Sequence, residues 1–281
     1  MATTTSLLAS LPQDIAREIF EFAAYSDRQC AMDLTLVSKD VRLWTLPVLY
    51  HTVRLSSTRA VTRFLEAITP SNKSTLTPYC PLHRRVKHLG IFALGPLDAI
   101  QRILTLCTDV QNLACGFSLR ALSTLKALPY FLDSEERQPI LPQSREYHLI
   151  GMSCRDGIPY NSIPSDTTHL HVQLSLDALG TLEALHGKLP SLTHLAVSIQ
   201  MPSTKPLGLV LPMIEAVLDD ASPKLESLRL QVMGSKAQAV ADAAINEWNG
   251  RDKRLSVVPS PGSLSKQWQE CHTGHEQLWS S

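Results

Sequence analysis

Histidine recurs at one position relative to leucine along the sequence. His148, His169 and His194 each come immediately before a leucine that opens an apolar-x-apolar segment, and His88 does the same earlier in the chain. Side chains alternate across a β-strand, so leucines that point into a core leave these histidines together on the opposite face. The pattern predicts a strip of His148, His169 and His194 that binds a protein substrate. The alternatives are a repeat idiom on an exposed sheet or a metal site.

Protonation would change such a strip. Unperturbed imidazole titrates near pH 6.5, and neutral rings can both donate and accept hydrogen bonds. Charged rings on adjacent strands repel one another, so we expect a lowered pKa for at least one of the three. The strip would then bind its substrate more weakly at about pH 5.5 than at neutral pH.

A second group of possible ligands lies near residue 271. Cys271, His272 and His275 offer one thiol and two imidazoles within a short stretch. Structural zinc sites use a closed set of four ligands, and no fourth candidate is close in sequence. We therefore expect no metal in this segment and no cofactor elsewhere in the chain.

The motifs of common enzyme classes are missing. Gly151-Met152-Ser153-Cys154-Arg155 lacks the second glycine of a nucleophile elbow, and Gly234-Ser235-Lys236 lacks the spaced glycines of a phosphate loop. No G-x-G-x-x-G occurs. A cysteine nucleophile at Cys107 or Cys154, paired with a histidine by folding, stays open. The sequence therefore favours a non-catalytic protein.

Composition narrows the class further. The 26 basic and 26 acidic residues cancel, whereas nucleic-acid binding needs a basic excess, so we expect no nucleic-acid partner. The six cysteines form no C-x-x-C pair and fit a reducing compartment. The first residues do not resemble a signal peptide, and the longest apolar stretch, residues 207–218, is too short to span a bilayer. These features predict a cytoplasmic or nuclear protein without a membrane partner.

A repeated frame runs through the middle of the chain. Seven short segments begin with a leucine followed two residues later by a small or apolar residue, and Val53-Arg54-Leu55 would precede them as a first strand. The frame leucines are Leu89, Leu113, Leu149, Leu170, Leu195, Leu228 and Leu255. Stretches with apolar residues at helical spacing lie between several of them, at residues 61–68, 97–104, 176–185 and 214–218.

This alternation has two interpretations. A strand with a returning helix, repeated every 20 to 35 residues or so, is typical of a leucine-rich-repeat-like solenoid, which we expect over residues 51–258. The alternative is a doubly wound α/β sheet, which would suit a small intracellular enzyme with its site at the carboxyl ends of the strands. The breaker-rich, polar residues 259–281 predict a flexible C-terminal tail.

The first 50 residues carry three short helical stripes. Ile15, Ile19 and Phe22 share one helical face, residues 30–37 contain a second stripe, and Val41 with Trp44 forms a third before Pro47, where we expect the helix to stop. Three helices of this length build a very small core, and such units usually need a neighbour or partner. The sequence therefore predicts a docking module.

The same stretch resembles a known family. Residues 11–20 (LPQDIAREIF) are similar to the opening Leu-Pro-x-(Asp/Glu)-Ile-x-x-x-Ile-Phe of the F-box. Residues 34–44 (LTLVSKDVRLW) resemble its second half, Leu-x-x-Val-(Cys/Ser)-(Lys/Arg) ending in Trp. Residues 46–55 (LPVLYHTVRL) are similar to the segment that follows the F-box in many fungal members, of basidiomycete-like type.

The resemblance implies a substrate-recognition adaptor of an SCF-type cullin ubiquitin ligase, with catalysis left to other subunits. The F-box, residues 1–50, would bind a Skp-type subunit and through it a cullin, and the repeats would bind a protein substrate. A repeat interaction module without a ligase role is an alternative. The residues carried over to the F-box core or docking face are Leu11, Pro12, Ile15, Ile19, Leu34, Val37 and Trp44.

Overall fold

The structure of the chain is a computed structural model. It belongs to the α/β class, as the sequence predicted. It contains a parallel sheet of eight strands and ten α-helices among the residues it describes. The described residues are 11–69, 81–126, 141–201, 208, 210–219, 224–248, 252–260, 262–273 and 278–279. Within this part of the chain, no helix is long and apolar enough to cross a membrane.

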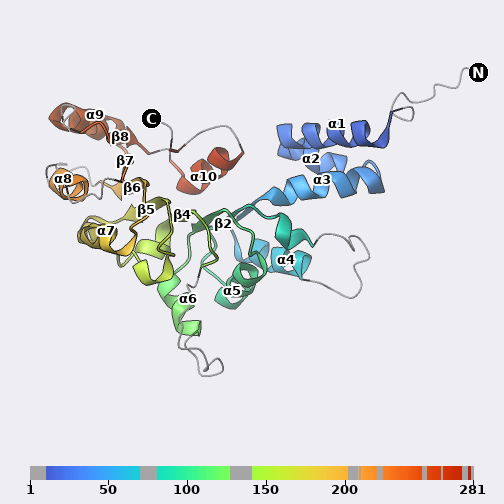
Figure 1. The fold of residues 1–281 in the computed structure, drawn as a ribbon, viewed down its shortest axis with the longest axis horizontal. Coiled ribbons are helices and arrows are strands. Elements are labelled where there is room, and N and C mark those ends of the chain that lie inside the picture. Colours follow the sequence, from blue (N-terminus) through green and yellow to red (C-terminus); the bar gives the residue numbers. More distant parts are fainter. Residues whose placement is uncertain are drawn as a thin grey trace, which may run out of the picture.

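Three helices form a module that projects from the sheet (Figure 1). They are α1 (Gln13–Ser26), α2 (Arg28–Leu34) and α3 (Lys39–His51), as the stripes predicted. Asp27 caps α2 by accepting a hydrogen bond from the Cys30 N–H at 2.9 Å, and Ser38 caps α3 in the same way. The prediction for Pro47 was wrong, because α3 continues past it. Packing of the last turn helps to hold the helix, since Tyr50 stacks on Phe64 with ring centroids 6.1 Å apart.

Eight parallel strands follow one another in space in the same order as in the chain. Each lies beside the next, from β1 to β8 (Figure 1). They are β1 (Thr52–Leu55), β2 (His88–Ile91), β3 (Asn112–Cys115), β4 (Glu146–Leu149), β5 (His169–Leu174), β6 (His194–Gln200), β7 (Ser227–Met233) and β8 (Leu255–Pro259).

The leucine frame gives the register of seven of these strands. Val53 and six of the frame leucines lie opposite one another across the sheet, which confirms that part of the prediction. In β4 the expected residue was wrong, because Tyr147 and not Leu149 pairs with Leu113 and Leu170. Both side chains are fully buried on the same face, so a period of two does not distinguish them. The Tyr147 hydroxyl is satisfied locally by the Pro142 carbonyl and the Ser144 N–H.

Helices that return between the strands cover the face bearing the frame residues, and together they form one apolar core. They are α4 (Thr58–Ile68), α5 (Leu97–Leu106), α6 (Leu119–Lys126), α7 (Leu185–Lys188), α8 (Leu211–Asp219) and α9 (Ala237–Trp248). Three of the four expected helical stretches are α-helices. The fourth is mostly a 3-10 helix, Leu176–Ala184, followed by the short α7.

Where the structure describes residues 259–281, they do not form the flexible tail that we expected. Pro259 still belongs to β8, and Leu264–His272 forms helix α10, which Ser263 caps. This helix packs on β1 and β2 from the face opposite the core, where a Cβ on Gly90 would lie 2.6 Å from the Trp268 ring. Trp268 and Leu278 are buried. The breaker residues and the overall polarity of this segment led to the prediction of a tail. The tryptophan was the residue that indicated a buried apolar contact.

Candidate functional site

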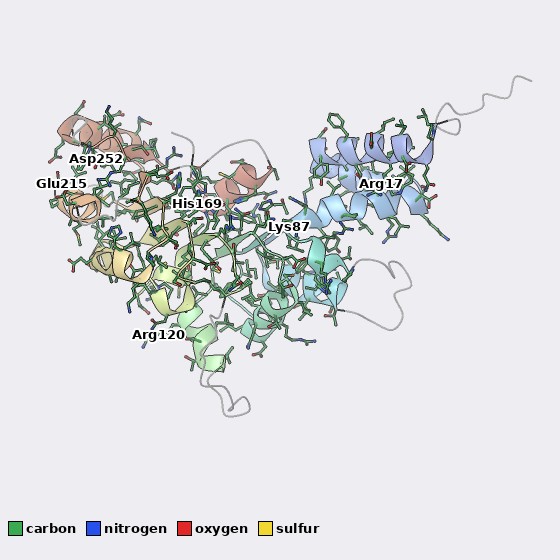
Figure 2. The ribbon with its side chains drawn as sticks, in the orientation of Figure 1. Arg17, Lys87, Arg120, His169, Glu215 and Asp252 are labelled. Carbon is green, nitrogen blue, oxygen red and sulfur yellow. The ribbon has the colours of Figure 1, made fainter. Side chains whose placement is uncertain are left out.

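The helical module carries most of the exposed apolar surface of the described residues. Twelve large hydrophobic side chains are exposed among all the described residues, and nine of them lie between residues 11 and 43. We call these nine the helix patch: Leu11, Ile15, Ile19, Phe22, Tyr25, Met32, Leu36, Val37 and Leu43. Ile15, Ile19 and Phe22 recur at helical spacing and form one stripe along α1. Arg17 of the same helix, labelled in Figure 2, pairs with Glu21 at 2.7 Å.

The seven residues carried over from the F-box divide into two groups. Leu11, Pro12, Ile15, Ile19 and Val37 are exposed, as a docking face requires. The other two are half-buried. These are Leu34 and Trp44, and the Trp44 ring lies 6.2 Å from that of Phe20 between centroids. Trp44 therefore contributes to the interior of the module, and the exposed group provides its outer surface.

The predicted histidines share the face of the sheet opposite the core, but they do not form one row. His169 (Figure 2) and His194 are in register and stack with ring centroids 4.3 Å apart. His148 pairs instead with His171, one pleat further along, and Glu146 occupies the place next to His169. The expected row of three was wrong because the frame of β4 is set by Tyr147.

The histidine strip is also less exposed than predicted. His148 is only 1% exposed, as is His171, its partner on β5, and His169 and His194 are half-buried. Trp279 lies over the strip, with its ring centroid 6.0 Å from that of His148 and 5.2 Å from that of His169. Its indole N–H donates a hydrogen bond of 2.8 Å to Glu146. The face is therefore a polar layer packed under the C-terminal segment.

Hydrogen bonds link polar side chains across this layer from strand to strand. His88 bonds Asn112 at 2.8 Å, and the Asn112 amide donates to Glu146 Oε2. Glu146 Oε1 lies 2.7 Å from His148 Nε2. We call the whole series the polar relay: His88, Asn112, Glu146, His148, His171, Ser198 and Gln231.

The second half of the polar relay is fully buried. The Nδ1 atoms of His148 and His171 lie 3.2 Å apart. His171 Nε2 is 2.8 Å from Ser198 Oγ, which donates to Gln231 Oε1 at 2.8 Å. Burial of so many polar groups is tolerated because each has a hydrogen-bond partner.

Burial sets the charge state of the layer. It lowers the pKa of His148 and that of His171, and it lowers the pKa of His88 to about 4. Burial alone would raise the pKa of Glu146, but hydrogen bonds from His148 and His272 outweigh it and hold that pKa well below its ordinary value. The pKa of His169 is lowered by burial first and by His194 second. The expected direction is confirmed, although burial and not repulsion is the larger cause.

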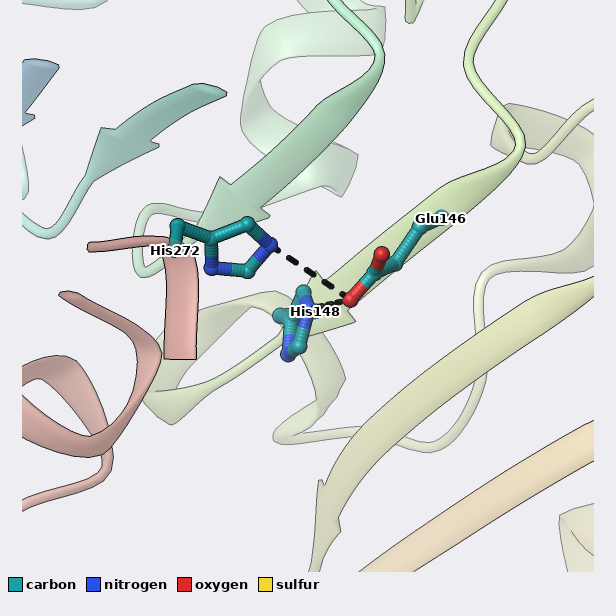
Figure 3. Close-up of side chains that lie close together, drawn as sticks. All are labelled: Glu146, His148 and His272. Carbon is teal, nitrogen blue, oxygen red and sulfur yellow. Dashed lines mark hydrogen bonds and ion pairs between the residues drawn. The ribbon is translucent and has the colours of Figure 1, made fainter. Parts of the chain in front are cut away.

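A histidine from the segment that was expected to be a flexible tail also lies next to Glu146. His272 at the end of α10 places Nε2 3.6 Å from Glu146 Oε1, and its Nδ1 donates to the Trp268 carbonyl at 2.6 Å. Figure 3 shows His272 and His148 converging on Glu146. The sequence pointed to His272 only within a possible ligand group, whose third member, His275, lies outside the described residues. Glu146 was missed, although a Glu-x-His pair on a strand places both side chains on one face.

The two cysteines considered as nucleophiles are buried in the core. Burial raises the pKa of Cys107 to about 12 and that of Cys154 to about 12. Both thiols therefore stay protonated at neutral pH, whereas a nucleophile has to be a thiolate.

Comparisons with family models, with curated proteins and with solved structures found no match to this chain. Its function has to be inferred from the helix patch and from the polar face of the sheet.

Proposed function

We propose that this chain is a substrate-recognition adaptor of an SCF-type cullin ubiquitin ligase. The three-helix module acts as an F-box and binds a Skp-type subunit, and through it a cullin. The sheet domain presents a protein substrate. The adaptor acts in the cytoplasm or nucleus by raising the concentration of substrate near catalytic subunits, and it performs no chemistry of its own.

The helix patch is the observation that carries this proposal. Large contiguous apolar surfaces are uncommon on soluble monomers and mark interaction sites. Here the surface lies on a projecting module with a very small interior, because the only hydrophobic residues buried between positions 11 and 51 are Ala24, Ala31 and Val41. The missing apolar burial is what a partner would supply.

The position of the motif on the helices supports the same conclusion. The stretch similar to the first half of the F-box, residues 11–20, leads into and begins α1. The stretch similar to the second half, residues 34–44, runs from the end of α2 into α3. The docking surface of the proposal therefore consists of the exposed members of the motif, among them Ile15, Ile19 and Val37.

Strand order supports a leucine-rich-repeat-like solenoid as the substrate-binding part. A doubly wound sheet reverses its strand order at a switch point and has helices on both faces. In this chain the order from β1 to β8 never reverses, and the helices between the strands pack on the face with the frame leucines. A row of short parallel strands with the returning helices on one face suits a repeat solenoid more than a doubly wound enzyme.

Partner binding with purified proteins tests the proposal. We expect the full chain to co-purify with a Skp-type subunit and the double variant Ile15→Asp, Val37→Asp to lose this binding. Two charges placed in a dry interface cost several kcal/mol, or a factor of about 100 or more in Kd. Both positions are exposed, so folding should be preserved.

Leu94→Asp is the matched control, because Leu94 is 67% exposed but lies outside the module. It should bind the Skp-type subunit like the unmodified chain. Unchanged binding of the folded double variant, checked by circular dichroism, or no binding by the unmodified chain, would contradict the proposed function.

A further inference from the structure

Three side chains able to ligate a metal ion meet where the end of α10 reaches β4. One ligand atom from each of Glu146, His148 and His272 lies within 4.8 Å of the other two (Figure 3). Glu146 Oε1 is 2.7 Å from His148 Nε2 and 3.6 Å from His272 Nε2. Zinc bound tetrahedrally at about 2.0–2.2 Å holds its ligand atoms about 3.3 Å apart, so small side-chain movements would make room for an ion.

Each of the three side chains also contacts a residue outside the cluster, as metal ligands usually do. A ligating histidine typically donates its other ring N–H to a carbonyl or another acceptor. His272 does so to the Trp268 carbonyl at 2.6 Å, and His148 has its second nitrogen against His171. The second oxygen of Glu146 accepts from the Asn112 amide. The orientation of all three is thus fixed by residues outside the cluster.

The direction of the polar relay limits which ring nitrogen of a neutral His148 can carry the hydrogen. Ser198 donates its single hydroxyl hydrogen to Gln231, so it can only accept from His171 Nε2. The other nitrogen of a neutral His171 then has to accept from His148 Nδ1. A neutral His148 protonated at Nδ1 turns a bare Nε2 towards a Glu146 oxygen 2.7 Å away.

Two facing acceptors need either a proton or a metal ion between them. A proton there would make His148 an imidazolium paired with the Glu146 carboxylate at 2.7 Å. A metal ion supplies a positive charge without a proton. Turning the Gln231 amide around would also remove the conflict, and the measurements below separate these arrangements.

We propose that Glu146, His148 and His272 bind one zinc ion that fastens α10 to the sheet. Two imidazoles and one carboxylate suit zinc, whereas calcium and magnesium prefer oxygen ligands alone. A surface cleft of about 700 Å³ lies beside the cluster and is lined by Asn112, Arg145, Glu146 and His169. The fourth position is left for water.

This site joins parts of the chain that are far apart in sequence. Glu146 and His148 belong to β4 and His272 to α10, so the ion would bridge the middle of the sheet and its C-terminal cover. The ion would hold the C-terminal segment on the sheet, although a site with three protein ligands and water is open, unlike a closed structural site with four. The proposal does not depend on the adaptor function.

Zinc binding by the full chain without a histidine tag tests the proposal. The protein is stripped with a chelator, dialysed, and titrated with zinc chloride in a calorimeter and against a fluorescent zinc indicator. We expect one zinc per chain. At about a hundredfold excess of free zinc over Kd, Tm should rise by at least about 5 °C. Cobalt should give visible bands of a tetrahedral site without thiolate charge transfer.

Variants locate the ion. His272→Gln and Glu146→Gln should each weaken zinc binding about 100-fold or more, and Asn112→Ala about 10- to 100-fold. Cys271→Ser tests the neighbouring thiol, and His186→Gln is a histidine control on α7, outside the polar face. Both should bind zinc like the unmodified chain.

The outcomes separate the site from its rivals. Loss of zinc binding in the folded His272→Gln and Glu146→Gln variants, with binding retained in both controls, supports the site. Failure of the stripped chain to bind zinc would leave only the hydrogen-bonded cluster and overturn the proposal. Equal affinity in His272→Gln or Glu146→Gln, or loss in Cys271→Ser, would place the ion on other ligands and also overturn it.

Discussion

The three-helix module and the eight-stranded sheet differ in how far they bury their apolar side chains. In the sheet, Leu89, Leu113 and Leu195 are completely buried between strands and returning helices. In the module, Ile19 is 47% exposed and Phe22 77% exposed. The sheet therefore completes its own core, whereas the module leaves apolar area for another molecule to cover. Apolar residues at helical spacing show which face of a helix is apolar, but not which molecule buries it.

The largest expected effect is in the centre of the sheet. Leu195→Ala removes a fully buried side chain from β6, and the cavity should lower the free energy of unfolding by about 2–5 kcal/mol. Chemical denaturation measures this. Leu94→Ala, at an exposed position, should change the same quantity by less than about 0.5 kcal/mol. Similar values for the two variants would mean that the sheet core is not the main source of stability.

A second change tests whether α10 belongs to the folded sheet. A methyl group on Gly90 would lie 2.6 Å from Trp268 and 2.7 Å from Phe92, so Gly90→Ala should displace α10 and cost up to about 3 kcal/mol. Amide hydrogen exchange in residues 264–272 should become faster. Gly180→Ala is the control, because its added methyl group meets nothing within 4 Å. Unchanged exchange in Gly90→Ala would show that α10 does not pack on β2 in solution.

The polar relay provides a third, intermediate test. Ser198→Ala leaves His171 Nε2 and Gln231 Oε1 without their shared partner in a buried layer, and this should cost about 1–2 kcal/mol. Ser175→Ala is the comparison, because Ser175 is exposed and makes no capping hydrogen bond. Equal stability of the two variants, measured by urea denaturation, would mean that water replaces the lost partner.

The smallest expected effect is in the module. Phe22→Ala should change the free energy of unfolding by no more than about 0.5 kcal/mol, because the Phe22 side chain is 77% exposed. Thermal denaturation at several protein concentrations measures it. A loss comparable with that of Leu195→Ala would show that the helix patch is already covered, for example by a second copy of the chain.

Local sequence patterns predicted most elements of the fold, because leucine spacing directly reports side-chain alternation in the strands. These patterns failed where packing between distant segments of the chain determines the structure. Tyr147 replaces a leucine in β4, and its hydroxyl finds partners that only the folded loop provides. Helix α10 has a polar sequence, and its position depends on Trp268 meeting Gly90 across the sheet.

The candidate site shows the same limit. The histidine spacing correctly placed His148, His169 and His194 on one face, because alternation is a local property. Their neighbours come from elsewhere in the chain. Trp279 and His272 come after the last strand in the chain and lie near the strip because the chain returns across the sheet. No spacing rule relates them to Glu146.

The return of α10 has a consequence for how the chain unfolds. In a linear array each repeat contacts only its neighbours, so the ends can fray while the middle stays folded. Here α10 follows the last strand, β8, and packs on the first two, and Arg54 of β1 donates a hydrogen bond of 2.9 Å to Gln269. The array is thereby closed upon itself. Separation of β1 or β2 from the sheet would break contacts with α10, so we expect the two ends to unfold more cooperatively than those of an open array.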